Sequence, residues 1–283
     1  MPVRQLLLLA SAALGFGYAQ APTPAVPDSV SIEANIPYGP YKETVLDVIQ
    51  PKAPRKGKRP GVICIHGGGW LEGTKEEYVS FWLPYIERGF VVANVEYRLG
   101  GVAKAPAAVS DVLNAARWFR KNAKRYNVDP KRIVVTGDSA GGHLALMVGM
   151  TPKIANLGPP ATVAAVINLY GITDVADQLS GPNMRRYTVA WVPDQPGRLE
   201  LARRISPMTY VRKNVPPILT IHGENDPSVP YEHGVSLTKA LRAKGADAEM
   251  IGVPQGKHGF PPEKMAQLYQ EIFAFLERRG VLR

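Results

Sequence analysis

The chain has 283 residues, 45% of them hydrophobic, and is therefore long and apolar enough to bury a large core in one domain. Its 34 Lys and Arg residues exceed its 24 Asp and Glu residues, which gives a formal net charge of +10. Because no clustered basic helix accompanies this charge, we expect a scattered, solvated surface charge and no nucleic acid partner, with attraction to anionic polysaccharide or envelope surfaces as the alternative. The single cysteine, Cys64, excludes an intramolecular disulfide, and its apolar neighbours predict a buried position in a strand.

The N-terminal segment has the pattern of a secretory signal peptide. Arg4 precedes a short apolar run at residues 6–14, and a small-residue cleavage site follows near Ala19 to Ala21. The apolar run is too short to span a membrane as a mature helix, so we expect no stable membrane insertion after cleavage. We therefore predict a signal peptide over residues 1–19, a Pro-rich leader over residues 20–30, and an exported protein that is periplasmic or secreted.

The remaining residues, 31–283, have the pattern of a single α/β domain. Residues 32–36 and 44–49 are typical of an antiparallel strand pair at the edge of a sheet. Short β-branched runs then alternate with helical stripes, which predicts a mostly parallel, doubly wound sheet with helices on both faces. The runs expected to form buried strands are residues 62–65, 132–136, 217–221 and 247–253, and the clearest helical stripe covers residues 107–126.

A glycine-rich turn follows the strand expected at residues 62–65, with the sequence His66-Gly67-Gly68-Gly69-Trp70. Acyl transfer develops negative charge on the substrate carbonyl oxygen, and fixed N–H donors must stabilise it. Consecutive glycines allow backbone N–H groups to point into a site without side chains in the way. This turn therefore favours an oxyanion-binding role, and the alternative is a tight turn that needs only positive φ.

A second motif, Gly137-Asp138-Ser139-Ala140-Gly141, lies between the strand expected at residues 132–136 and a helix expected from Ala140. A strand that turns sharply into a helix needs small residues, because the helix must approach the sheet closely. Such a turn exposes Ser139 above the sheet edge, with the positive helix N-terminus behind it. We interpret the motif as a nucleophile elbow; the alternative is a glycine-rich connector.

Two later loops contain the acid and the histidine that such a serine needs, in that chain order. Asp226 follows the strand expected at residues 217–221, where its carboxylate can reach a histidine of the next loop, and Glu224 is the competing carboxylate. His258 follows the last expected strand. The other four histidines are assigned to the oxyanion turn, the elbow helix, a strand end and an exposed helix start, in the order His66, His143, His222 and His233.

Together these four motifs resemble the α/β-hydrolase superfamily, and more closely its BD-FAE-like and hormone-sensitive-lipase-like esterases, from about Ile36 to the C-terminus. The resemblance implies that Ser139 is the nucleophile, that His258 is general base and then general acid, and that Asp226 is the orienting carboxylate. The oxyanion donors that the resemblance implies are the backbone amides of Gly68, Gly69 and Ala140. The chain is short for the hormone-sensitive-lipase-like group, which favours the BD-FAE-like group.

The periodicity weakens over residues 172–215, where Pro, Arg and Gly accumulate. In the family that the chain resembles, an insertion at this place forms part of a lid over the acyl pocket. We expect Tyr187 and Trp191 of the insertion, together with Trp70, to line the substrate pocket, and the alternative is that they only pack the insertion onto the body. The segment has no long amphipathic helix, so it favours short acyl groups over lipids.

These features predict a serine carboxylesterase that hydrolyses short-acyl esters, either of small molecules or linked to polysaccharide, through an acyl-enzyme. A polysaccharide deacetylase, a feruloyl esterase and an arylformamidase are alternatives within the same group, because the motifs do not separate them. A catalytically silent binding module is disfavoured because all three triad positions are filled, and a prolyl-oligopeptidase-type peptidase because no residues remain for a propeller. We expect no cofactor and no metal, since no His-x-x-x-His or Cys-x-x-Cys spacing occurs, and no oligomeric state is indicated.

Overall fold

The computed structural model describes residues 26–282. The predicted signal peptide and its cleavage site lie outside the described residues, as does most of the predicted Pro-rich leader. Within residues 26–282, no helix has the length and apolar character needed to cross a membrane.

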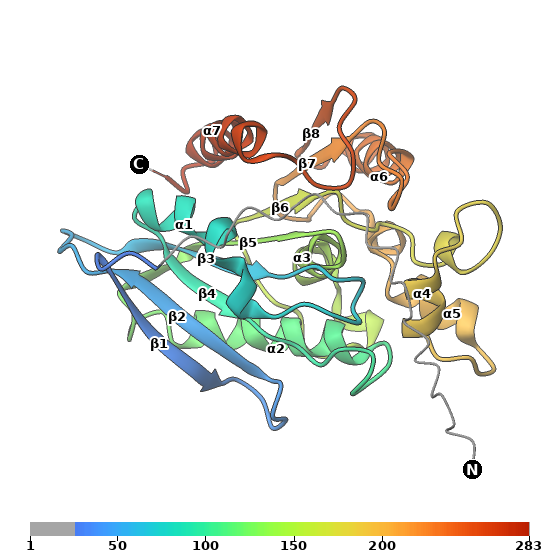
Figure 1. The fold of residues 1–283 in the computed structure, drawn as a ribbon, viewed down its shortest axis with the longest axis horizontal. Helices are drawn as coiled ribbons and strands as arrows, with labels where there is room; N and C mark the ends of the chain where they lie inside the picture. Colours follow the sequence, from blue (N-terminus) through green and yellow to red (C-terminus); the bar gives the residue numbers. More distant parts are fainter. Residues whose placement is uncertain (1–25, 283) are drawn as a thin grey trace, which may run out of the picture.

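The core of the molecule is one sheet of eight strands in the order β1-β2-β4-β3-β5-β6-β7-β8 (Figure 1). The pairs β1–β2 and β2–β4 are antiparallel, and all the other neighbouring strands are parallel. This arrangement confirms the predicted doubly wound sheet with an antiparallel pair at its edge. The strands are β1 (Val30–Pro37), β2 (Val45–Pro51), β3 (Arg59–Ile65), β4 (Val91–Val95), β5 (Val128–Asp138), β6 (Ala165–Leu169), β7 (Ile218–Gly223) and β8 (Ala248–Val253).

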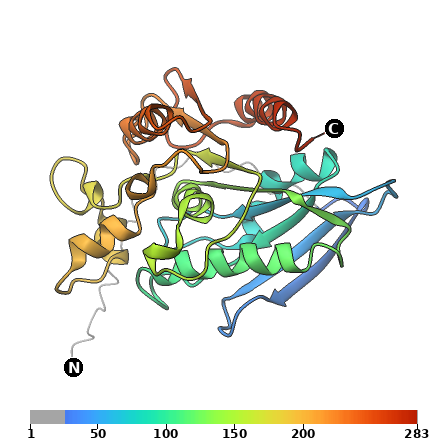
Figure 2. The ribbon, with the colours of Figure 1, turned by 180° about the vertical axis from the view of Figure 1, so that it is seen from behind.

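Helices cover both faces of this sheet, as the alternating pattern predicted. Residues of α2, α3 and α6 pack against one face, where Figure 2 shows α2 and α3 in front of the strands, and residues of α1 and α7 pack against the other. The α-helices are α1 (Val79–Glu87), α2 (Ala107–Lys121), α3 (Ala140–Met150), α4 (Arg186–Trp191), α5 (Arg198–Arg204), α6 (Glu232–Ala243) and α7 (Pro262–Arg278). The 3-10 helices are η1 (Lys75–Tyr78), η2 (Lys153–Ala155), η3 (Asp177–Leu179) and η4 (Pro207–Tyr210).

The central strands are buried on both sides, which explains their continuous apolar sequence. Along β3, Val62 and Cys64 contact the core on one face, while Ile63 and Ile65 contact the core on the other face. Each fully buried aliphatic side chain of this kind stabilises the fold by roughly 1.5–3 kcal/mol. Cys64 is buried as predicted, and burial raises the pKa of its thiol well above the ordinary value.

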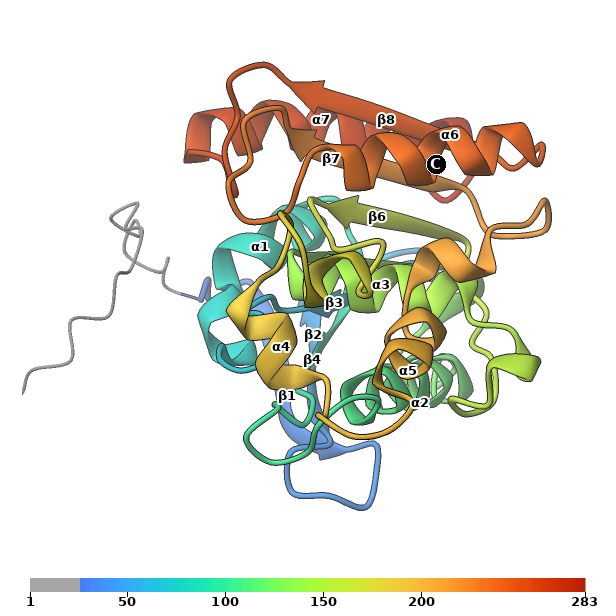
Figure 3. The same ribbon diagram turned by 90° about the vertical axis from the view of Figure 1, so that its right-hand side faces the viewer.

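The segment 172–215 gathers at the end of the molecule remote from β1 (Figure 1), and Figure 3 looks onto that end. It consists of η3, α4, α5, η4 and connecting loops, and it contains no strand. Its two α-helices have only six and seven residues. The segment therefore contains no long amphipathic helix, as its sequence predicted.

The parallel register explains how distant loops come together. Ile65 of β3 pairs with Gly137 of β5, so the turns that follow these two strands begin at the same level of the sheet. Gly223 of β7 pairs in the same way with Val253 of β8. Because the carboxyl ends of parallel strands share one edge, all four predicted motifs follow strands that end at that edge.

Candidate active site

Ser139 occupies a strained turn between β5 and α3. Its φ of 52° lies in the left-handed region, which L-residues rarely adopt. A Cβ atom at Gly137 would collide with the carbonyl of Gly141, and a Cβ atom at Gly141 would collide with the carbonyl of Ile65. Only glycine fits at both places, as the interpretation of this motif as an elbow requires. The Ser139 amide donates to Leu169 O at 2.9 Å, which fixes the turn on the neighbouring strand.

The predicted serine, histidine and acid form one hydrogen-bonded chain. His258 Nε2 lies 2.8 Å from Ser139 Oγ, and His258 Nδ1 lies 2.7 Å from Asp226 Oδ2. With Nδ1–H donating to the carboxylate, Nε2 is the acceptor for the serine hydroxyl. Glu224, the competing carboxylate, is exposed and makes no hydrogen bond to this histidine within residues 26–282.

The Asp226 carboxylate is held as an anion inside the protein. Its side chain is 0% exposed, and burial alone raises the pKa of a carboxyl group. Hydrogen bonds from His222 and His258, and from the backbone amide of Val229, outweigh that effect and bring the pKa of Asp226 well below its ordinary value. Its Oδ1 also accepts from the amide of Ser228 at 2.7 Å. Asp226 therefore stays ionised at neutral pH.

The oxyanion turn adopts the backbone conformation that its glycines permit. Gly68 and Gly69 have φ values of 99° and 56°, and a Cβ atom at Gly68 would collide with the carbonyl of Glu72. Neither glycine amide donates to an acceptor within residues 26–282. The amide of Ala140, as the first residue of α3, has no acceptor in its own helix.

A set of polar and aromatic residues that sequence reasoning missed supports this turn. The Tyr97 hydroxyl donates to His66 O at 3.0 Å and to Gly67 O at 3.2 Å, while the Tyr97 ring stacks on the His66 ring at 4.3 Å. The Gly67 amide donates to the Tyr78 hydroxyl at 2.8 Å, and Glu96 Oε1 lies 2.9 Å from His66 Nε2. These residues come from η1 and from the segment after β4, and nothing in the sequence pattern linked them to the turn.

Two of the three predicted pocket residues are buried in a stack on one another. The rings of Trp70 and Trp191 stack at 4.0 Å, and both side chains are 0% exposed, so neither lines an open pocket. Trp70 Nε1 donates to His143 Nδ1 at 3.1 Å, and His143 Nε2 lies 2.7 Å from Ile205 O. Burial lowers the pKa of His143 to about 4, so this bridge is neutral at physiological pH. Tyr187, the third predicted residue, is half-buried and lies beside Gly69.

Asp138, next to the predicted nucleophile, is a second titratable group that sequence reasoning missed. Burial raises its pKa to about 6, although the nearby His258 and His66 act in the opposite direction. Its Oδ1 is buried and finds no hydrogen-bond partner within residues 26–282. Asp138 therefore binds its proton more tightly than an ordinary carboxyl group, in contrast to Asp226.

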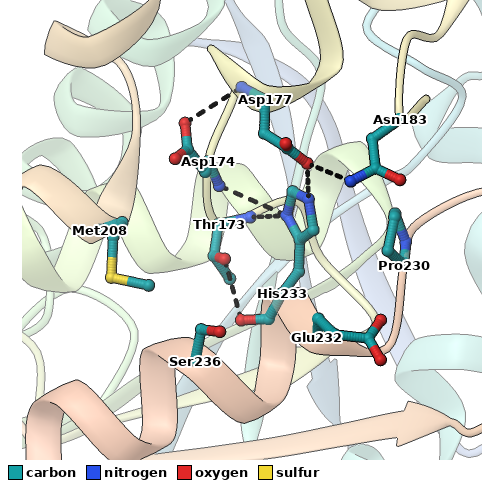
Figure 4. A pocket seen from close by; sticks show the side chains of 9 residues that line it. All are labelled: Thr173, Asp174, Asp177, Asn183, Met208, Pro230, Glu232, His233 and Ser236. Carbon is teal, nitrogen blue, oxygen red and sulfur yellow. Dashed lines mark hydrogen bonds and ion pairs between the residues drawn. The ribbon is translucent and has the colours of Figure 1, made fainter. Parts of the chain in front are cut away.

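A polar cavity of about 290 Å³ lies outside the triad, between the segment 172–215 and the start of α6 (Figure 4). None of its lining residues belongs to the predicted catalytic set. His233, which the sequence placed at an exposed helix start, is only 5% exposed, so that prediction is wrong. Its Nδ1 accepts from the amide of Thr173 at 3.1 Å, and its Nε2 lies 3.2 Å from Asp177 Oδ2. His233 thus fastens α6 to the segment 172–215. Within residues 26–282, no group of three His, Cys, Asp or Glu side chains is arranged to hold a metal ion.

Comparison with known proteins supports the predicted family. Esterase LipQ of Mycobacterium tuberculosis is 30% identical over 80% of this chain, and an ethyl acetate hydrolase of Pseudomonas putida is 28% identical over 70%. The chain spans 57% and 65% of the length of these two relatives. A truncated carbohydrate esterase from gut microbiota has a similar structure, with a TM-score of 0.79, 28% identity, and coverage of 90% of this chain and 98% of that one. The BD-FAE family model matches residues 46–241, most of the chain, which therefore belongs to the BD-FAE family within the α/β-hydrolase fold.

Proposed function

We propose that this chain is a serine carboxylesterase that hydrolyses short-acyl esters through an acyl-enzyme. The observation that carries the proposal is the hydrogen-bonded chain from Ser139 through His258 to Asp226, with distances of 2.8 Å and 2.7 Å. The relatives named as an esterase and as an ethyl acetate hydrolase support the same class of reaction.

Each step of the reaction uses groups of this site. His258 Nε2 takes the proton from Ser139 Oγ as the oxygen attacks the ester carbonyl carbon. The negative charge that develops on the carbonyl oxygen is stabilised by the backbone amides of Gly68, Gly69 and Ala140. The protonated imidazole then gives its proton to the leaving alcohol, and the acyl group remains on Ser139.

Water completes the cycle by the same route. His258 removes a proton from a water molecule, whose oxygen attacks the acyl carbon; the bond from that carbon to Ser139 Oγ then breaks, the acid leaves, and His258 returns the proton to Ser139 Oγ. Asp226 stays ionised throughout, because its hydrogen bonds hold its pKa low; it keeps the imidazole in the productive tautomer and stabilises the imidazolium.

The test of the catalytic assignment is Ser139→Ala, assayed on p-nitrophenyl acetate. We expect the rate to fall about 10⁶-fold with an unchanged circular dichroism spectrum, because the nucleophile is lost and the fold is kept. Retention of more than a few per cent of the activity would contradict the entire assignment.

The preference for short acyl groups rests on the size of the insertion. Because α4 and α5 have only six and seven residues, and Trp191 is committed to stacking on Trp70, little apolar surface is left for a long chain. We expect kcat/KM to be highest for acetyl to butyryl esters and to fall at least about tenfold by decanoyl. A p-nitrophenyl ester series from acetate to palmitate measures this, and a maximum at decanoyl or longer would contradict it.

A polysaccharide-linked ester is the second candidate substrate, favoured by the likeness to a carbohydrate esterase over 98% of that chain. Acetate release from acetylated xylan tests this candidate, with methyl ferulate and N-formylkynurenine beside it for the feruloyl esterase and arylformamidase alternatives. Acetate release with kcat/KM above that for p-nitrophenyl acetate supports a carbohydrate ester, and activity confined to small esters refutes it.

A further inference from the structure

The start of α4 is connected to the loop that carries Asp226. Arg185, the residue before α4, donates from Nε to Ser228 O at 2.6 Å and from Nη2 to Pro227 O at 3.2 Å. The Tyr187 hydroxyl donates to the same Ser228 O at 3.2 Å. Two side chains of the segment 172–215 therefore bind two consecutive carbonyl groups of the Asp226 loop.

The amide ends of the same two peptide groups hold Asp226. In the Pro227–Ser228 peptide group, the carbonyl accepts from Arg185 while the Ser228 N–H donates to Asp226 Oδ1 at 2.7 Å. In the Ser228–Val229 peptide group, the carbonyl accepts from Arg185 and Tyr187 while the Val229 N–H donates to Asp226 Oδ1 at 2.9 Å. Each peptide group thus connects the guanidinium to the carboxylate.

This geometry has an electrostatic consequence as well as a steric one. A cation at a peptide carbonyl polarises the peptide group and strengthens its N–H as a donor, because hydrogen bonds in series reinforce one another. The Arg185 guanidinium therefore strengthens both bonds to Asp226 Oδ1 and leaves Oδ2 aligned with His258 Nδ1. Its planar fork reaches both carbonyls at once, which a lysine ammonium on its flexible stem does not reproduce.

The same helix also contacts the oxyanion turn. A Cβ atom at Gly69 would lie 3.0 Å from Tyr187 Cβ, and Trp191 at the end of α4 stacks on Trp70. Arg185 is itself fixed, because its backbone amide donates to Gln178 O at 3.0 Å. One short helix therefore joins the loop of the acid to the turn that supplies the oxyanion donors.

We propose that Arg185 is a positioning residue for the ester hydrolysis, acting on Asp226 through the two peptide groups that it binds. The inference rests on the proposed function of the triad. The competing view is that Arg185 only fastens the segment 172–215 to the body and contributes to folding alone.

Arg185→Ala tests the inference, with Arg186→Ala as the matched control. Arg186 is the next residue, is exposed, and makes no side-chain hydrogen bond within residues 26–282. We expect Arg185→Ala to lower kcat for p-nitrophenyl acetate about 10- to 100-fold with KM little changed, because misalignment by about 1 Å has such an effect. Arg186→Ala should stay within about twofold of wild type. If Arg185→Ala does not fold, Arg185→Lys and Arg185→Gln take its place.

A double-mutant cycle with Asp226→Asn separates positioning from stability. If Arg185 acts through the carboxylate, its removal in the Asp226→Asn background should change kcat less than about threefold. An equal loss in both backgrounds, or wild-type kcat in Arg185→Ala, overturns the positioning role. Failure of the proposed function looks different: wild type then hydrolyses no ester, or Ser139→Ala keeps its activity.

Discussion

The Asp138 carboxyl beside the nucleophile predicts that the fold loses stability as the pH rises, which is the opposite of the usual effect of a carboxyl group. Its pKa is raised by burial from an ordinary value of 3.8 to about 6. A carboxyl whose pKa is raised on folding binds a proton more tightly in the native state, so it stabilises the fold below pH 3.8 and loses that effect as pH rises through about 6. Above that pH the native state carries a poorly solvated charge.

The magnitude follows from the shift in pKa. A difference of about two pKa units corresponds to about 3 kcal/mol of unfolding free energy at pH 8. Asp138→Asn removes the charge and nearly keeps the shape, so we expect the variant to be more stable than wild type at pH 8 by about 2–3 kcal/mol. The difference should shrink towards zero as the pH is lowered to about 4.

Urea unfolding of both proteins at several pH values between 4 and 8 measures this difference. The other titrating groups are the same in both proteins, so their contributions to the unfolding free energy cancel. A matched control is Asp129→Asn, since Asp129 is paired with Arg132 and its pKa is lowered, chiefly by a hydrogen bond from the Lys131 amide. That variant should lose stability at pH 8. If Asp138→Asn is equal to or less stable than wild type at pH 8, the carboxyl is not held in a desolvated position and the reasoning fails.

Three further predictions address the acid, the aromatic stack and the export segment. Asp226→Asn should lower kcat about 10⁴-fold by favouring the wrong imidazole tautomer, whereas Glu224→Gln should leave it nearly unchanged, and esterase assays of both variants decide between the two carboxylates. Trp191→Ala should lower the free energy of unfolding by about 3–5 kcal/mol through the cavity that it opens beside Trp70, and urea unfolding that shifts by less than about 1 kcal/mol contradicts the stacked arrangement. Expression of the full chain in a bacterium should give a periplasmic or secreted protein whose N-terminus, read by mass spectrometry, starts near Ala19 to Ala21, and an uncleaved cytoplasmic product contradicts the predicted signal peptide.

The triad could be predicted because each member follows a strand whose sequence is clear. The runs before Ser139 and Asp226 are largely β-branched and apolar, the run before His258 contains Ile251 and Val253, and parallel strands bring the loops after all three to one edge of the sheet. By contrast, the sequence does not predict β4 and β6. In each of them a buried asparagine interrupts the apolar run that would indicate a strand.

The contacts around the site could not be read from the sequence, because they join residues far apart in the chain. No local pattern links Trp70 to Trp191, and an aromatic residue near a predicted site is equally compatible with a pocket wall and with a buried stack. The burial of Asp138 depends on how β3 and β5 end beside one another. The two peptide groups that connect Arg185 to Asp226 likewise exist only in three dimensions.

The stack of Trp70 on Trp191 determines how this scaffold can be re-engineered. A cap that only covers a pocket can be exchanged between enzymes as a module, but here a helix of the insertion supplies part of the hydrophobic interior. Removing α4 would uncover the ring face of Trp70 that Trp191 covers, on the order of 100 Å², which corresponds to a cost of about 2–3 kcal/mol, a large share of the net stability of many domains. Substrate range in this scaffold should therefore be altered by single substitutions on the exposed side of α4, and grafting of a larger cap should give insoluble protein.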